Sequence, residues 1–133
     1  MARILIVDDD EIVRFLMAAL LEGMHHQPIA VQNGVDALRA HRESPADLVI
    51  TDIYMPDMDG LELIRTLNAA KPAPPIIAMS GSASDRRMDA LPMAEHFGAS
   101  AILYKPVDVA ALKAVVTRLL ADGSGAYPAD LEG

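Results

Sequence analysis

Five short apolar runs, separated by helical stretches, constrain the fold more than any other feature of this sequence. The runs are RILIV (3–7), QPIAV (27–31), DLVIT (47–51), PIIAM (75–79) and AILYK (101–105), the second being the weakest. Between them apolar residues recur at helical spacing, for example at Ile12, Phe15, Leu16, Ala19 and Leu20. Buried strands that alternate with helices are typical of a parallel sheet covered on both faces. The sequence therefore predicts an α/β fold, a doubly wound sheet of five parallel strands in five β–α units.

A single domain accounts for nearly the whole chain. With 133 residues, of which 52% are hydrophobic, the chain can bury a core without disulfides or a structural metal. The strand and helix patterns continue to residue 122, so we expect one domain over 1–122. The remaining residues, GSGAYPADLEG (123–133), lose this periodicity and are rich in small residues. We expect them to form a flexible tail, either a remnant of a linker or a cloning scar.

Composition argues against several classes of protein. The chain has no cysteine, which rules out disulfides and thiolate metal sites and fits a reducing cytoplasm. The apolar run at the N-terminus is too short for a signal peptide or a membrane span. The net charge of −8 opposes binding to nucleic-acid phosphates and to anionic lipid. We therefore expect a soluble cytoplasmic protein that binds neither nucleic acid nor a membrane directly.

Polar side chains stand where four of the predicted strands end. Asp8 and Asp9 follow the first run, Asp52 the third and Ser80 the fourth, while Lys105 closes the fifth. The carboxyl ends of parallel strands joined by right-handed crossovers lie on one edge of the sheet, where the ligand crevices of open α/β sheets form. We therefore expect three carboxylates, a hydroxyl and an amine to converge at this edge.

These groups together predict a cation site and a phosphoryl acceptor. The three carboxylates carry one negative charge each and Lys105 one positive charge, which leaves an excess that one divalent cation would neutralise. Oxygen ligands without histidine or cysteine suit Mg²⁺, which often bridges a phosphate. A carboxylate can then attack phosphorus, with Lys105 and Ser80 bound to the oxygens where charge develops. We therefore assign Asp52 as the covalent acceptor.

Four motifs, taken together and in this order, resemble the receiver domain of two-component response regulators. They are ILIVDDD, DLVITDIYMPDMDG, IIAMSGSA and GASAILYKPVD, and the resemblance covers roughly residues 2–121. It implies a flavodoxin-like (βα)5 fold with strand order 2-1-3-4-5. It also implies a phosphoprotein that accepts a phosphoryl group from the phosphohistidine of a sensor histidine kinase or a phosphotransfer protein. Its catalysis would be limited to that transfer and to the later loss of the phosphate.

The resemblance implies a role for each acidic residue of the site. Asp52 is similar to the phosphoacceptor, and Asp9 and Asp52 are similar to the direct ligands of Mg²⁺ or Mn²⁺. The backbone carbonyl of Tyr54 would be the third protein ligand. Asp8 resembles the acid that acts through metal-bound water.

The remaining positions resemble the switch of the family. Ser80 resembles the hydroxyl that moves to the phosphoryl group, and Lys105 resembles the cation that pairs with it. Gly81 has no side chain to block the phosphoryl group. Pro106 matches a proline whose preceding peptide bond is usually cis in the family, against about 5–6% of X–Pro bonds generally.

Two positions depart from the family pattern, and both affect the output face. Ile102 occupies a position that often carries an aromatic side chain, whose rotamer changes on activation. Pro92 interrupts the fourth helix, which we expect to be short, displaced or kinked. We expect output, and any homodimer, on the face formed by the fourth helix, fifth strand and fifth helix, without an aromatic switch. The sequence does not identify the downstream protein or output domain.

Two other functions fit part of the sequence. A phosphotransferase of the haloacid dehalogenase type also uses an aspartate nucleophile and Mg²⁺, and DDDEI contains the pattern Asp-x-Asp. That family places its nucleophile after the first strand and usually needs a longer chain. A flavodoxin-like cofactor carrier would need a phosphate loop rich in Ser, Thr and Gly after the first strand, which this sequence lacks. Asp10 is expected to cap the first helix, and we assign no phosphohistidine or metal role to His25, His26, His41 or His96.

Overall fold

Five strands alternate with five helices in the part of the chain that the structure describes. The structure is a computed structural model that describes residues 1–53, 60–80 and 90–123. The strands are β1 (Arg3–Val7), β2 (Gln27–Val31), β3 (Leu48–Asp52), β4 (Ile76–Ser80) and β5 (Ala101–Tyr104). The helices are α1 (Glu11–Gly23), α2 (Gly34–Glu43), α3 (Gly60–Asn68), α4 (Ala90–Phe97) and α5 (Val109–Gly123).

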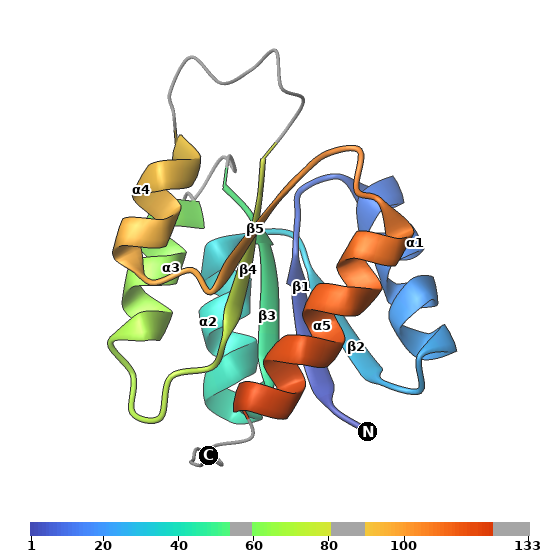
Figure 1. Cartoon of the computed structure of the whole chain (residues 1–133). Coiled ribbons are helices and arrows are strands. Elements are labelled where there is room, and N and C mark those ends of the chain that lie inside the picture. Colours follow the sequence, from blue (N-terminus) through green and yellow to red (C-terminus); the bar gives the residue numbers. More distant parts are fainter. Residues whose placement is uncertain (54–59, 81–89, 124–133) are drawn as a thin grey trace.

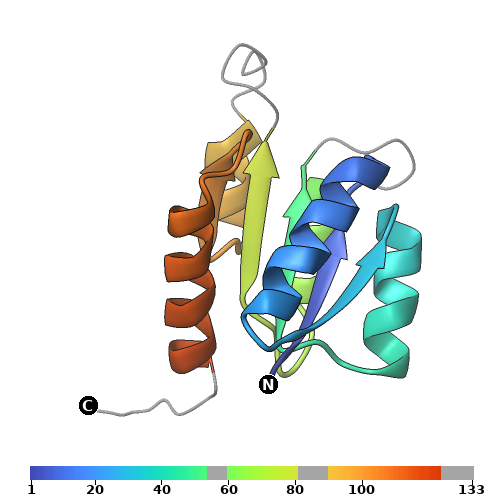
Figure 2. The ribbon, with the colours of Figure 1, turned by 90° about the vertical axis from the view of Figure 1, so that its right-hand side faces the viewer.

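The five strands form one parallel sheet in the order β2-β1-β3-β4-β5. Their carboxyl ends lie at the same edge of the sheet, which is the upper edge in Figures 1 and 2. The predicted fold class, a doubly wound (βα)5 sheet with strand order 2-1-3-4-5, is therefore confirmed. The weakest run, QPIAV, forms the edge strand β2, where Pro28 is tolerated because an edge strand has only one neighbour to bond.

Two strands extend one residue beyond the predicted ends. Asp52 is the last residue of β3 and Ser80 the last residue of β4, whereas the sequence pattern placed both just after their strands. Backbone hydrogen bonds explain the difference, because the ladder continues past the apolar runs: Ile53 N–H donates to Met79 O at 2.9 Å, and Lys105 N–H donates to Ser80 O at 2.9 Å. Both side chains are therefore held by a backbone that belongs to the sheet.

The helices cover the two faces of the sheet (Figure 1). One core cluster lies between the sheet and α1 and α5, and it includes Met17, Leu21 and Leu112. The other lies between the sheet and α2, α3 and α4, and it includes Leu63 and Leu67. The central strands β3 and β4 are buried along their whole length, which is why their sequences are continuous apolar runs.

The helix α1 presents apolar residues on more than its buried side. Its core-facing residues are Met17 and Leu21, which are buried. Three residues of the stripe that predicted the helix are instead exposed: Ile12 at 69%, Phe15 at 72% and Leu16 at 60%. The helix begins after Asp10, whose carboxylate accepts hydrogen bonds from the backbone of Ile12 and Val13, so its predicted role as the N-cap is confirmed.

The helix α4 is short, as predicted. It comprises eight residues, Ala90–Phe97, and Pro92 lies in its first turn. A proline is tolerated there because its missing N–H would have no partner inside the helix. No helix within the described ranges has the length and the apolar character needed to cross a membrane.

Candidate functional site

Three carboxylates meet at the carboxyl edge of the sheet, as predicted. Asp8 follows β1 directly, Asp9 precedes the cap of α1, and Asp52 ends β3. One carboxylate oxygen from each of them lies within 4.8 Å of the others. Asp8 and Asp52 are buried, whereas Asp9 is exposed to solvent. The cluster therefore opens to solvent on the side of Asp9.

The Lys105 amine lies between the two buried carboxylates. Its Nζ donates to Asp8 Oδ2 at 2.6 Å and to Asp52 Oδ2 at 3.3 Å. Burial alone would lower the pKa of Lys105, but the hydrogen bond to Asp8 and the charges of Asp52 and Asp8 outweigh it and raise this pKa. Lys105 is therefore a permanent cation that neutralises part of the negative charge at the site.

Every polar group of Asp8 has a hydrogen-bond partner. Its N–H donates to Val31 O at 3.2 Å, its Oδ1 accepts from Asp10 N–H at 2.9 Å, and its Oδ2 accepts from Lys105. Its backbone carbonyl accepts from Arg14 Nη1 at 2.8 Å. Arg14 is a residue of the site that the sequence reasoning missed. Its only signal in the sequence is a cation near the start of a helix, where the helix dipole disfavours positive charge.

The backbone around Asp52 is closely packed. Gly60, the first residue of α3, donates its N–H to Ile53 O at 2.6 Å. A Cβ atom on Gly60 would overlap the carbonyl oxygen of Asp52 and lie 2.5 Å from the Cα of Ile53. The carbonyl oxygen of Asp52 accepts a hydrogen bond from the buried hydroxyl of Thr51, at 2.9 Å. The position of Asp52 thus depends on a glycine eight residues further along the chain.

The structure places three of the other predicted residues, and two lie outside the part of the chain that it describes. Ser80 is buried at the end of β4, next to Tyr104 across the sheet. The peptide bond between Lys105 and Pro106 is cis, the geometry that the resemblance implied. Ile102 is partly buried and packs against the core beneath α3 and α4. Tyr54 and Gly81 lie outside the described residues.

The donor set fits a hard divalent cation. The clustered ligands are carboxylate oxygens, and one oxygen-rich cluster with net negative charge is the environment that Mg²⁺ and Mn²⁺ prefer. Each carboxylate oxygen of Asp8 already accepts a hydrogen bond, whereas no hydrogen bond of the Asp9 side chain is found among the described residues. Asp9 is therefore the better placed of the two for direct contact with a cation.

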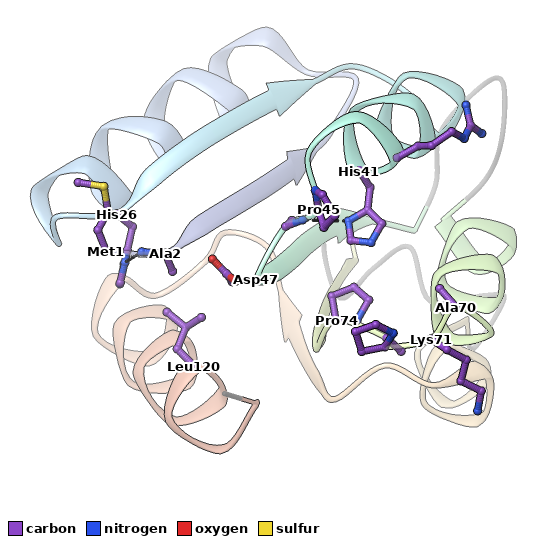
Figure 3. A pocket seen from close by; sticks show the side chains of 14 residues that line it. Met1, Ala2, His26, His41, Pro45, Asp47, Ala70, Lys71, Pro74 and Leu120 are labelled. Carbon is purple, nitrogen blue, oxygen red and sulfur yellow. Dashed lines mark hydrogen bonds between the residues drawn. The ribbon is translucent and has the colours of Figure 1, made fainter. Parts of the chain in front are cut away.

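A cavity of about 760 Å³ lies at the opposite edge of the sheet, far from the acidic cluster (Figure 3). Three of its polar side chains accept hydrogen bonds from the backbone. His26 Nδ1 accepts from Ala2 N–H at 3.1 Å, and His41 Nδ1 accepts from Ala46 N–H at 3.0 Å. Asp47 Oδ2 likewise accepts from Arg3 N–H at 2.8 Å. These side chains hold the amino ends of strands and the turns before them, which is a structural role.

We predict that His41 makes the fold less stable in mild acid. Burial lowers the pKa of His41 below its ordinary value of 6.5 in the folded state, and burial followed by the N-terminal amine lowers that of His26. Protonation of Nδ1 would remove the acceptor of the Ala46 N–H. The unfolded chain therefore binds more protons as pH falls below 6.5, and stability that is present above 6.5 is lost below it.

Thermal unfolding at pH 7.5 and pH 5.5 tests this prediction. The wild type should lose stability over this interval, and His41→Gln should lose less of it. An equal loss in His41→Gln would show that His41 does not contribute to the acid response.

Comparisons with known proteins identify a family that the chain resembles. The sequence matches the family model of the response regulator receiver domain over residues 4–117. PilH of Pseudomonas aeruginosa is 35% identical over 123 residues, which cover 91% of this chain and 99% of PilH. The DNA-binding transcriptional regulator NtrC of Azospirillum brasilense is 36% identical over 131 residues, which cover 97% of this chain and 27% of NtrC. This chain thus spans only about a quarter of the length of NtrC.

A solved structure agrees with the observed fold. The signal receiver domain of a signal transduction histidine kinase from Syntrophus aciditrophicus matches with a TM-score of 0.83 at 28% identity. The match covers 100% of this chain and 98% of that one.

Proposed function

The chain belongs to the response regulator receiver domain family, and we propose that it accepts a phosphoryl group on Asp52 in the cytoplasm, as the switch of a two-component system. The observation that carries this proposal is the contact of Lys105 Nζ with both buried carboxylates, Asp8 and Asp52, beside an exposed Asp9. This site thus combines an anionic nucleophile, Asp52, with a fixed cation, Lys105, and it is open to a phosphodonor on the side of Asp9.

Asp9 and Asp52 are proposed to bind Mg²⁺ or Mn²⁺ directly, with the Tyr54 carbonyl as a further ligand and Asp8 acting through a water. The exposure of Asp9, and the hydrogen bond that each carboxylate oxygen of Asp8 already accepts, support this division of roles. Bound there, the cation would supply the positive charge that lets an anionic phosphoryl group approach a carboxylate. Asp8 meanwhile holds the Lys105 amine in place through its bond of 2.6 Å.

Phosphoryl transfer would form one bond and break another. An oxygen of Asp52 bonds to phosphorus while the bond from phosphorus to the histidine nitrogen of the donor breaks, and the electron pair leaves with that nitrogen. Lys105 is already within 3.3 Å of Asp52 Oδ2 and can pair with the transferred phosphoryl oxygens. Ser80 is buried at the end of the neighbouring strand β4, and its hydroxyl is proposed to donate a hydrogen bond to the same group.

Intact-mass analysis tests the proposal. Incubation with Mg²⁺ and a small acyl-phosphate donor should add one phosphoryl group to the wild type. Ser80→Ala should also gain it, because the hydroxyl is proposed to respond to the phosphoryl group and not to accept it. Asp52→Asn should remain unmodified, and excess chelator should suppress the reaction. Asp52→Asn that is modified as fully as the wild type, or a reaction that proceeds equally well in excess chelator, would reject Asp52 as the metal-dependent acceptor.

The protein donor is proposed to dock on the exposed apolar part of α1. Ile12, Phe15 and Leu16 are each more than half exposed. Leu16 also lines a groove of about 610 Å³ between α1 and α5. Lys105 and Pro106 line the same groove, so it opens next to the acidic cluster. A histidine kinase or phosphotransfer protein that brings a phosphohistidine to Asp52 would therefore cover this apolar surface.

We predict that Phe15→Ser slows transfer from a protein donor by about tenfold, because docking would bury the phenyl ring. The same variant should react with a small acyl phosphate at the rate of the wild type. Val35→Ser is the matched control, since Val35 is an exposed apolar residue of α2. An equal loss with both donors, or no loss with the protein donor, would contradict docking on α1.

Output is proposed to pass through the face formed by α4, β5 and α5. Ile102 is partly buried there and branched at Cβ, so it cannot move an aromatic ring between buried and exposed positions. A homodimer through this face is the proposed assembly. Light scattering before and after phosphorylation would detect it, and an unchanged monomer mass would count against it.

A further inference from the structure

Arg14 makes a contact that none of the roles above explains. Its guanidinium Nη1 donates to the backbone carbonyl of Asp8 at 2.8 Å. The side chain leaves the first turns of α1 and is partly buried. The dipole at the start of α1 disfavours a positive charge at this position. A positive charge here would also repel a divalent cation bound at the acidic cluster. A geometric role would account for its presence.

The hydrogen bonds around Asp9 indicate what that role is. The peptide group before Asp9 is held by Arg14, which binds the Asp8 carbonyl. The peptide group after Asp9 is held by Asp8 Oδ1, which accepts from Asp10 N–H at 2.9 Å. The Asp9 side chain has no hydrogen bond of its own among the described residues, so its direction depends on these two peptide groups.

We propose that Arg14 is a positioning residue for the divalent-cation site. By holding the Asp8 carbonyl, it orients the Asp8–Asp9 peptide so that the carboxylate of Asp9 faces that of Asp52. This inference rests on the proposed function, since it assumes that Asp9 and Asp52 bind a divalent cation. Arg14 would thus orient the exposed ligand Asp9, although its own side chain touches neither the cation nor the phosphoryl group.

The direction in which Mg²⁺ affinity changes when Arg14 is removed distinguishes a positioning role from a purely electrostatic one. If Arg14 acted only as a nearby positive charge, its removal would tighten Mg²⁺ binding. If it positions Asp9, its removal weakens binding, because partners that orient metal ligands typically contribute about 10- to 100-fold in affinity. The two roles therefore predict changes in opposite directions.

The experiment is a Mg²⁺ titration of the unphosphorylated protein, followed by amide chemical shifts and by calorimetry. Arg14→Met should bind Mg²⁺ about tenfold more weakly than the wild type. Arg14→Lys, which keeps a long donor, should recover most of the affinity. Arg14→Gln should bind Mg²⁺ as weakly as Arg14→Met, because the glutamine side chain is too short to reach the Asp8 carbonyl. It replaces Arg14→Met in the test if that variant does not fold. Lys113→Met, which removes an exposed cation of α5, is the charge control and should not weaken binding.

The outcomes separate the two hypotheses. A wild type that shows no Mg²⁺-dependent shifts would overturn the cation site and the role of Arg14 together. A wild type that binds Mg²⁺, with Arg14→Met and Arg14→Gln binding equally well or more tightly, would overturn the role of Arg14 alone. Weaker binding in Arg14→Met that Arg14→Lys does not recover would also contradict positioning through the Asp8 carbonyl.

Discussion

Lys105→Met is expected to destabilise the protein strongly in Mg²⁺-free buffer and to make it depend on Mg²⁺ for stability. The amine is the cation that contacts both Asp8 and Asp52, whose side chains are almost entirely buried. Removing one member of a buried ion pair takes away the counter-ion of the remaining buried charge, which costs about 3–5 kcal/mol. We expect a loss of roughly 3 kcal/mol, the lower end of that range, because a fifth of the Lys105 side chain is exposed.

Chemical denaturation with chelator and with saturating Mg²⁺ measures this effect. The added cation should restore most of the lost stability in Lys105→Met, because it supplies positive charge to the same carboxylates and binds the folded state only. Lys113→Met, on the exposed surface of α5, should change little under either condition. A Lys105→Met protein as stable as the wild type in chelator would show that the ion pairs contribute no stability.

Gly60→Ala is the second change with a large expected effect. The new methyl group would overlap the backbone carbonyl of Asp52 and lie 2.5 Å from Ile53 Cα, and backbone atoms of a buried strand cannot yield as a flexible side chain does. Added volume in a packed core typically costs about 1–3 kcal/mol. We expect the upper end of that range, together with displacement of Asp52.

The matched control for this variant is Gly23→Ala. Gly23 ends α1, and a Cβ atom at this position would have no neighbouring heavy atom within 4 Å, so the added methyl group meets open space. Alanine there should be neutral or stabilising by about 0.5–1 kcal/mol. Denaturant unfolding would compare the two variants, and weaker Mg²⁺ binding in Gly60→Ala would report the displaced carboxylate. Equal stability of the two variants would contradict the close packing around Asp52.

The acidic cluster could be predicted because topology brings its members together. Asp8, Asp52 and Lys105 lie at the ends of strands that are far apart in the sequence, but parallel strands place all carboxyl ends at one edge. The polar residues that follow apolar runs were therefore sufficient to identify it. The exact strand ends were less predictable, because Asp52 and Ser80 join their strands through backbone bonds that no side-chain pattern encodes.

The surface of α1 illustrates a limit of periodicity. Helical spacing at Ile12, Phe15 and Leu16 correctly predicts a helix, but a second apolar set that includes Met17 and Leu21 is the one that faces the core. When apolar residues surround a helix, spacing alone does not select the buried side. Arg14 could not be assigned either, because its partner is a backbone carbonyl, which every residue has and no sequence pattern distinguishes.

Chemical localisation of the phosphoryl group is the direct test of Asp52 as the acceptor. After reaction with Mg²⁺ and a small acyl-phosphate donor, borohydride reduction converts an aspartyl phosphate to homoserine, and fragmentation of the resulting peptides identifies the residue. We expect homoserine at position 52, and none at positions 8 and 9. Homoserine at either of those positions with Asp52 intact, or a phosphoryl group found on a histidine, would contradict it.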